Sequence, residues 1–441
     1  MISTKCIGYR SCVVVLIIEK SSSDMKISVF YTWFWILYIP LCILFYDRVN
    51  DYVDEFMTLA LALYTLTKLN KRSSSKAQKE IVVYVVLVVL YFLNTMSLRI
   101  KCTNALLLDM QQQVRPYVVF YCTYLLAPTF KKWQSNLMIT VLTVCMGAYV
   151  LMSLYGFRIS TFGLQTPAIG QASLMVSMLY LFCYGDKGDN KWIALIIVAI
   201  GLLSGKSKVL GEFIAFVGVF FILKNKLNLT SAKSILQLLL LVVIVLFFTW
   251  TKFNAYYVEG LSKEEVGQMD ARPASYAVAG DIILKDYVPF GSGFASFATN
   301  AAAVHYSPLY YKYKLDDIWG LSPDNPMFIA DAYYPTLAQF GLVGIFFFLW
   351  FWIRRYKEVA NKKEKIYYKV GLMCILALAL ESTADTSYLS GKGMGYFMML
   401  AMCIRAGENN IRKRRRIIII NRKVAERGNT SKEIADENSG R

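Results

Sequence analysis

The chain has 441 residues, of which 56% are hydrophobic, and it carries a formal net charge of +18 with a mean hydropathy of +0.43. Because soluble domains are only about 45–50% apolar, this composition excludes an ordinary soluble fold. The positive charge therefore does not indicate nucleic acid, since membrane proteins collect cations in the loops that orient their spans.

Apolar runs of membrane length recur along the chain, and they do not alternate with polar residues as barrel strands would. We expect an all-α polytopic bundle of about twelve transmembrane helices, with one large extracytoplasmic loop late in the chain. Residues 1–26 would form a cytoplasmic leader, with Met25 as an alternative start. The predicted spans are 27–46, 53–69, 80–98, 114–130, 136–156, 168–184, 190–204, 207–223, 234–250, 333–353, 366–383 and 389–405.

The charges of the connecting segments alternate with the predicted spans. Basic segments fall on one side, which the positive-inside rule makes cytoplasmic. The basic tail 406–441 agrees, so both termini would be cytoplasmic and the loop 251–332 extracytoplasmic. The basic segments are Asn70–Lys79, Lys131–Lys132, Lys187–Lys191, Lys224–Lys233 and Arg354–Lys365.

Several cations fall on the other side, where the orientation rule disfavours them. A phosphate-bearing ligand would compensate them, because arginine forks onto phosphate oxygens and lysine supplies a point charge. The alternative is that they contact anionic lipid headgroups. These cations are Arg99, Lys101, Arg115, Arg158, Lys206, Lys208 and Arg272.

The stretch of roughly 80 residues between Trp250 and Leu337 is polar and aromatic-rich, and a long insert of this kind is often functional. It contains Arg272-Pro-Ala-Ser-Tyr and then Pro289-Phe-Gly-Ser-Gly-Phe-Ala-Ser-Phe, in which Gly291 and Gly293 allow a tight turn or a close approach to a ligand. It ends with Asp331 shortly before Gly341-Leu-Val-Gly. Nine cysteines occur in the chain, none in this loop and none as CxxC, so we expect no disulfide framework, no metal site and no cofactor.

This set of motifs resembles the O-antigen polymerase and O-antigen ligase superfamily of bacterial envelope enzymes. That family has an upstream arginine, a "hPhGxGxxxF" turn and an acidic or histidine residue before "GhhG" in a late extracytoplasmic loop. Leu203-Ser-Gly-Lys-Ser-Lys resembles its "(T/S)xSR" element, with Lys208 in place of arginine. Asp109 followed by Arg115-Pro116 resembles its "D…(K/R)P" entry to a middle span. The ligase-type histidine is absent near the last motif, which favours polymerase over ligase.

The resemblance implies an inner-membrane glycosyltransferase that extends O-antigen, capsule or exopolysaccharide without metal. A polyprenyl-diphosphate-linked oligosaccharide is the donor, and the sugar hydroxyl of a second lipid-linked unit attacks it. Membrane lipids, a chain-length regulator and a flippase are the implied partners, and nucleic acid is not.

Roles for individual residues follow as hypotheses. Arg272 and Lys208 would hold the diphosphate, with Arg115 and Arg158 as weaker contributors. Asp331 would orient the acceptor or act as base. Asp109 could take that role or simply pair with Arg115. His305, the only histidine, could act in proton transfer or be a packed loop residue, and Tyr306 is one of several aromatics that could stack on sugars.

Two alternative functions are a lipid-linked oligosaccharide flippase and the ligase branch, which would join finished glycan to a lipid core or protein. A lipid-linked oligosaccharide flippase would also handle this substrate, although it should show two related halves, and no internal repeat is evident. A structural scaffold would leave the displaced cations and the glycine turn unexplained.

Overall fold

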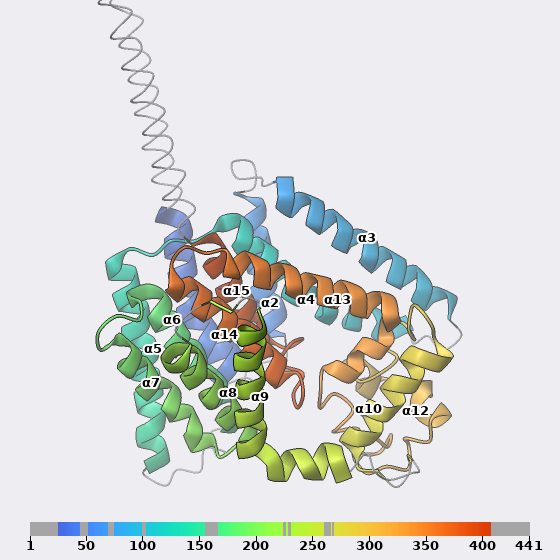
Figure 1. The fold of residues 1–441 in the computed structure, drawn as a ribbon. Helices are drawn as coiled ribbons and strands as arrows, with labels where there is room; N and C mark the ends of the chain where they lie inside the picture. Colours follow the sequence, from blue (N-terminus) through green and yellow to red (C-terminus); the bar gives the residue numbers. More distant parts are fainter. Residues whose placement is uncertain are drawn as a thin grey trace, which may run out of the picture. The chain divides into compact units, whose positions relative to one another are not determined.

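The computed structural model describes residues 25–44, 52–68, 75–98, 103–154, 166–223, 226–227, 231–259, 266 and 269–406. These residues are mostly helical and include no strand, only a lone bridge between Ser322 and Asn325. The all-α class is therefore confirmed (Figure 1). Most of the leader 1–26, Arg99, Lys101, Arg158 and nearly all of the tail 406–441 lie outside the described residues.

The first helix, Met25–Leu44, closes with the π-helical segment η1 (Ile39–Leu44). The helices before the late loop are α2 (Val53–Leu66), α3 (Ser75–Ser97), α4 (Thr103–Leu126), α5 (Lys132–Leu154), α6 (Thr166–Tyr184), α7 (Asn190–Ile200) with η4 (Gly201–Ser204), α8 (Ser207–Val217) with η5 (Gly218–Ile222), and α9 (Ala232–Phe253) with η6 (Asn254–Glu259). The helices after it are α13 (Gly341–Ala360), α14 (Lys365–Glu381) and α15 (Gly391–Arg405).

Each predicted span coincides with a helix, but two boundaries differ clearly. The helix that contains the span predicted at 114–130 begins at Thr103, because the polar turns that precede the span are helical and bury Asp109 among hydrogen-bonding partners. The span predicted at 333–353 begins at Gly341, because Tyr334–Gln339 forms a 3-10 turn, η9, instead.

The late loop has a small core of its own. Helix α10 (Ala271–Asp281), the π-helical segment η8 (Ile282–Asp286) and the short helices α11 (Asn300–Val304) and α12 (Pro308–Lys312) surround it. Phe297 and Tyr310 stack with ring centroids 5.4 Å apart. The loop is therefore a folded unit attached to the helices, able to hold side chains in fixed positions.

Basic segments predicted to be cytoplasmic contact one another. Lys226 Nζ donates to the carbonyl oxygens of Ala360, at 2.9 Å, and Lys362. Lys369, in the first turns of α14, forms an ion pair with Asp186 at 3.4 Å. The segments around residues 186, 226 and 362 therefore lie at the same end of the helices.

Two helices in the described part of the chain are long and apolar enough to cross a membrane, Met25–Leu44 and Ala77–Ser97. They suggest membrane association. Helix Ala77–Ser97 is mostly exposed, and its outward face carries Val82, Val85, Val89 and Leu93, each at least 50% exposed.

Candidate functional site

The glycine turn of the late loop packs against the start of α13. Gly291 has φ +77° and Gly341 has φ +57°, and each backbone leaves no room for a Cβ atom on the other. The backbone N–H groups of Ser292 and Gly293 donate to the carbonyl oxygens of Ala338 and Gln339, at 3.1 and 2.9 Å. The "GxG" and "GhhG" motifs therefore form one backbone contact.

Asp109 binds the backbone of this turn at Ala295, after the second glycine. Its carboxylate is fully buried and accepts hydrogen bonds from the backbone N–H of Ala295 at 2.6 Å and from Gln113 Nε2 at 3.3 Å. Thr95 Oγ1 accepts from the N–H of Phe294 at 2.9 Å. Asp109 thus serves the turn, and the alternative pairing with Arg115 is wrong, because Arg115 binds other carboxylates.

Arg272 and Asp331, both predicted site residues, form an ion pair. Arg272 lies in the first turn of α10, and its Nε donates to Asp331 Oδ2 at 2.8 Å, with a second bond from the terminal nitrogen. Asp331 follows the short helices of the late loop and precedes η9. Folding therefore brings together two residues that are 59 positions apart.

Lys208 forms ion pairs with two carboxylates, one at the last residue of α14 and one four residues beyond it. Gly205, with φ +63°, ends η4 and lets the chain restart as α8, so that Lys208 lies in the first turn of that helix. A cation is unfavourable there because the helix N-terminus is itself positive. Glu381 at 2.8 Å and Asp385 compensate it.

The segment that carries Asp385 connects these groups to the late loop. We call residues 382–390 the α14–α15 loop. The hydroxyl of Tyr276 donates to the Thr383 carbonyl at 3.1 Å, and Thr386 Oγ1 donates to the Ala330 carbonyl at 3.1 Å. Ser387 Oγ contacts both Glu381 Oε2, at 3.1 Å, and Asp385 Oδ1, at 2.9 Å.

The ion pairs are close enough to influence one another, and together they form what we call the charge cluster: Lys208, Arg272, Asp331, Glu381 and Asp385. Burial raises the pKa of Asp331, an increase that the Arg272 guanidinium partly opposes, and Asp385 and Lys208 also act on this carboxyl. Burial also acts to raise the pKa of Asp385, but Lys208 and Lys392 outweigh it and leave that pKa lowered. Asp331 is thus the more readily protonated of these two carboxylates.

Arg115 does not join the charge cluster. It forms ion pairs with Asp54 and Glu55 of α2 and donates to the Leu389 carbonyl at 3.2 Å. Asp54 also accepts from the N–H of Gly391 at 2.9 Å. Arg115 therefore fixes the end of the α14–α15 loop to α2 and α4.

The remaining predicted residues lie apart from the ion pairs. The His305 side chain is exposed at the end of α11, and the structure gives its imidazole no hydrogen bond to the charge cluster. Tyr306 donates to the Leu321 carbonyl at 2.8 Å and contacts the rings of Tyr310 and Tyr311. Tyr306 thus belongs to the core of the late loop.

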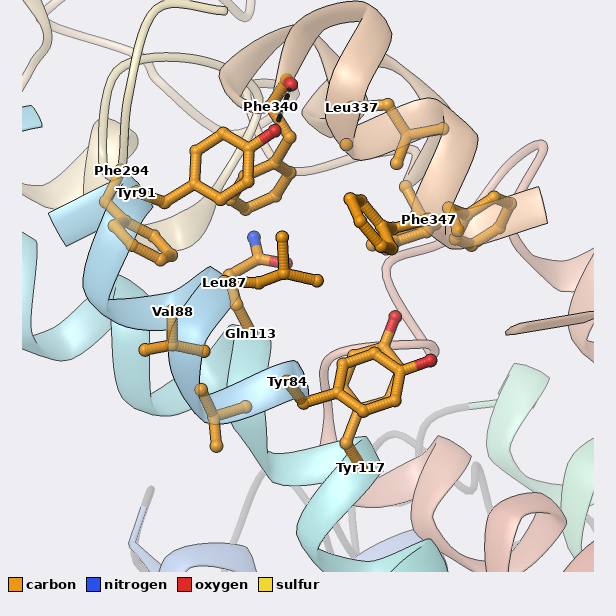
Figure 2. Close-up of a pocket in the computed structure, with 14 residues that line it drawn as sticks. Tyr84, Leu87, Val88, Tyr91, Gln113, Tyr117, Phe294, Leu337, Phe340 and Phe347 are labelled. Carbon is orange, nitrogen blue, oxygen red and sulfur yellow. Dashed lines mark hydrogen bonds between the residues drawn. The ribbon is translucent and has the colours of Figure 1, made fainter. Parts of the chain in front are cut away.

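An apolar pocket of about 110 Å³ borders this region. Figure 2 shows it between α3, α4 and the start of α13, with Tyr91, Phe294, Phe340 and Phe347 around it. Tyr333 also lines it, two residues beyond Asp331, and stacks on Tyr388 of the α14–α15 loop at 4.0 Å. The stacked pair Tyr333 and Tyr388 therefore connects the lining of the pocket to the two segments that carry Asp331 and Asp385.

Sequence reasoning did not single out Glu381, Asp385 or Ser387. The available signal was Glu381 itself, because it stands inside the predicted span 366–383, and an ionisable residue in a membrane-length segment is by default a functional candidate. Glu212, inside the predicted span 207–223, carried the same signal.

No family model and no curated protein matches this sequence.

Proposed function

We propose that this chain is a polymerase of polyprenyl-diphosphate-linked oligosaccharide repeat units at the outer face of the bacterial inner membrane. The observation that carries this proposal is the meeting of Arg272, Asp331, Lys208 and Asp385 next to an aromatic pocket. A lipid diphosphate has the matching form, an anionic head joined to an apolar tail.

Exposed apolar helix faces support the membrane part of the proposal. Besides α3, the outward residues of α9 include Leu236 and Val243, which are 67% and 59% exposed. Water disfavours such surfaces, whereas lipid does not. Twelve spans, with the basic segments cytoplasmic and the charge cluster outside, would account for both the apolar faces and the grouping of basic segments.

The ion pair between Arg272 and Asp331 suggests how the reaction would proceed. Phosphate oxygens of the donor would take over the guanidinium, which leaves Asp331 without its cation and better able to accept a proton. The acceptor hydroxyl oxygen then bonds to the anomeric carbon, and the bond from that carbon to the diphosphate breaks. Its electron pair leaves on the phosphate oxygen that Lys208 and Arg272 stabilise, while the hydroxyl proton moves to Asp331.

The test is chain elongation by the purified protein supplied with its lipid-linked repeat unit and no nucleotide sugar. We expect a ladder of glycans, and Arg272→Ala should reduce its rate at least a hundredfold, the loss typical of an oxyanion-stabilising group. Lys285→Ala is the matched control, since Lys285 is a cation of the same loop that is 71% exposed and pairs with Asp281 at the surface. Equal losses in both variants would contradict a specific role for Arg272.

A flippase is the second candidate, because the bundle buries ion pairs such as Arg115 with Asp54. Buried ionisable residues inside membrane segments are typical of transporters. Reconstituted vesicles separate the two functions: a flippase would move the lipid-linked unit across the bilayer intact and form no ladder.

A further inference from the structure

A second carboxyl group lies one helical turn beyond Lys208. Glu212 is on the same face of α8, four residues on, and is 1% exposed. Neither of its oxygens has a hydrogen-bond partner among the described residues. Burying a carboxylate without a partner costs free energy, so we expect Glu212 either to bind a cation or to carry a proton.

The side chains around Glu212 also present unpartnered oxygens. The Glu381 carboxyl lies within hydrogen-bonding reach of it, and Glu381 is fully buried with Oε1 unpartnered. Tyr396 of α15, whose buried hydroxyl also lacks a partner, acts electrostatically on both carboxyls. Gln171 of α6 donates through Nε2 to Ser387 at 2.7 Å, and Ser387 in turn contacts Glu381, while the buried Oε1 of Gln171 is unpartnered.

One proton accounts for the close approach of the two carboxyl groups. If Glu212 is protonated, its O–H can donate to the Glu381 carboxyl. The residues that the structure describes contain no group of three carboxylate, histidine or cysteine side chains able to hold a metal ion. The geometry therefore favours a proton over a metal cation.

The charges of the surrounding elements lead to the same conclusion. The groups that act on Glu212, or on the carboxylates beside it, are Lys208 on α8, Glu381 on α14, Asp385 on the α14–α15 loop, Lys392 on α15 and, further out, Asp331 with Arg272. With Glu212 protonated, each carboxylate in this set is matched by one cation. With Glu212 ionised, one negative charge is in excess beside Lys208.

We propose that Glu212 and Glu381 form a buried proton-binding site that keeps Lys208 available to an anionic substrate. Glu212 is then a positioning residue, because it acts on the substrate only through Glu381 and Lys208. Loss of the proton would add a negative charge next to the site and repel a diphosphate. The identity of the substrate rests on the proposed function, whereas the bound proton does not.

The proton itself is tested by infrared spectroscopy of the purified full-length protein. A protonated buried carboxyl absorbs apart from the carboxylates, so we expect one carboxylic-acid band near neutral pH that Glu212→Gln removes. Tyr396→Phe should keep the band, because the Tyr396 hydroxyl makes no hydrogen bond to Glu212. The matched control Glu364→Gln alters an exposed carboxylate before α14 and should leave the band unchanged. Absence of the band, or a band that survives Glu212→Gln, would overturn the proposal.

The consequence for Lys208 is tested by the pH dependence of glycan elongation. In the wild type, KM for the lipid-linked unit should rise by roughly tenfold as the medium becomes alkaline, the size expected of one extra charge in a partly buried site. Glu212→Gln, whose amide can still donate to Glu381, should remove that rise. An unchanged rise in the variant would refute the link to Lys208.

The two proposals fail in different ways. If no ladder forms but the infrared band behaves as expected, the polymerase function is contradicted and the proton-binding site is supported. If a ladder forms but the band is absent, only the proton-binding site is contradicted.

Discussion

Gly291 is a residue at which backbone geometry leaves no room for a side chain. A Cβ atom there would come within 3.0 Å of Gly341 N, Ala338 O and Gln339 C, all of them backbone atoms that cannot rotate away. The φ of +77° adds strain for any residue with a side chain. The motif thus depends on this residue for packing, whatever the ligand.

We expect Gly291→Ala to destabilise the protein by about 2–4 kcal/mol, from the combined cost of the strained φ and the overlap. Gly280→Ala is the matched control in the same loop, since Gly280 lies in α10 and an added methyl group would meet nothing within 4 Å. That change should stabilise the helix by up to about 1 kcal/mol. Thermal unfolding in detergent compares them, and similar melting temperatures would contradict the packing role.

At the level of elements, a buried ion pair joins α3 to α13. Arg355 is 1% exposed, pairs with Glu80 at 2.7 Å and lies over the rings of Phe120 and Phe351. Tyr121 of α4 donates to the same carboxylate at 2.9 Å. Glu80, near the start of α3, therefore binds the C-terminal parts of both α13 and α4.

We expect Arg355→Met to cost about 3–5 kcal/mol, because it leaves Glu80 buried with less compensating charge. Arg354→Met removes the neighbouring arginine, which is 29% exposed and also pairs with Glu80, and should cost within about 1 kcal/mol. Unfolding by denaturant in mixed micelles measures both. The double variant Glu80→Gln with Arg355→Met should recover part of the loss, and purely additive effects would show that the two residues do not act as a pair.

The helices could be predicted from the sequence because apolar runs reveal them one segment at a time. The boundary predicted at residue 114 was wrong because a polar residue before it, Asp109, has hydrogen-bonding partners in another segment. The pairing of Arg272 with Asp331 was not predicted, because these residues are 59 positions apart. The partners of Lys208 lie 173 and 177 residues away, and no local pattern encodes such a contact.

At the level of the whole molecule, the membrane orientation that we propose rests on the apolar surfaces and the basic segments. The grouping of Lys226 with Ala360 and of Lys369 with Asp186 marks one end of the helices as basic. The positive-inside rule makes such an end cytoplasmic. The late loop, which leads into the opposite end of α13, would then be outside.

Cysteine labelling in whole cells tests this orientation. His305 and Asn361 are both exposed, the first in the late loop and the second between α13 and α14, so His305→Cys and Asn361→Cys offer matched reporters. A thiol reagent that cannot cross membranes should label His305→Cys on intact cells, and Asn361→Cys only after the cells are opened. Wild-type protein is the blank, since its described cysteines are buried or half-buried. Labelling of both reporters on intact cells would place residues 305 and 361 on one side, and α13 could then not cross the membrane between them.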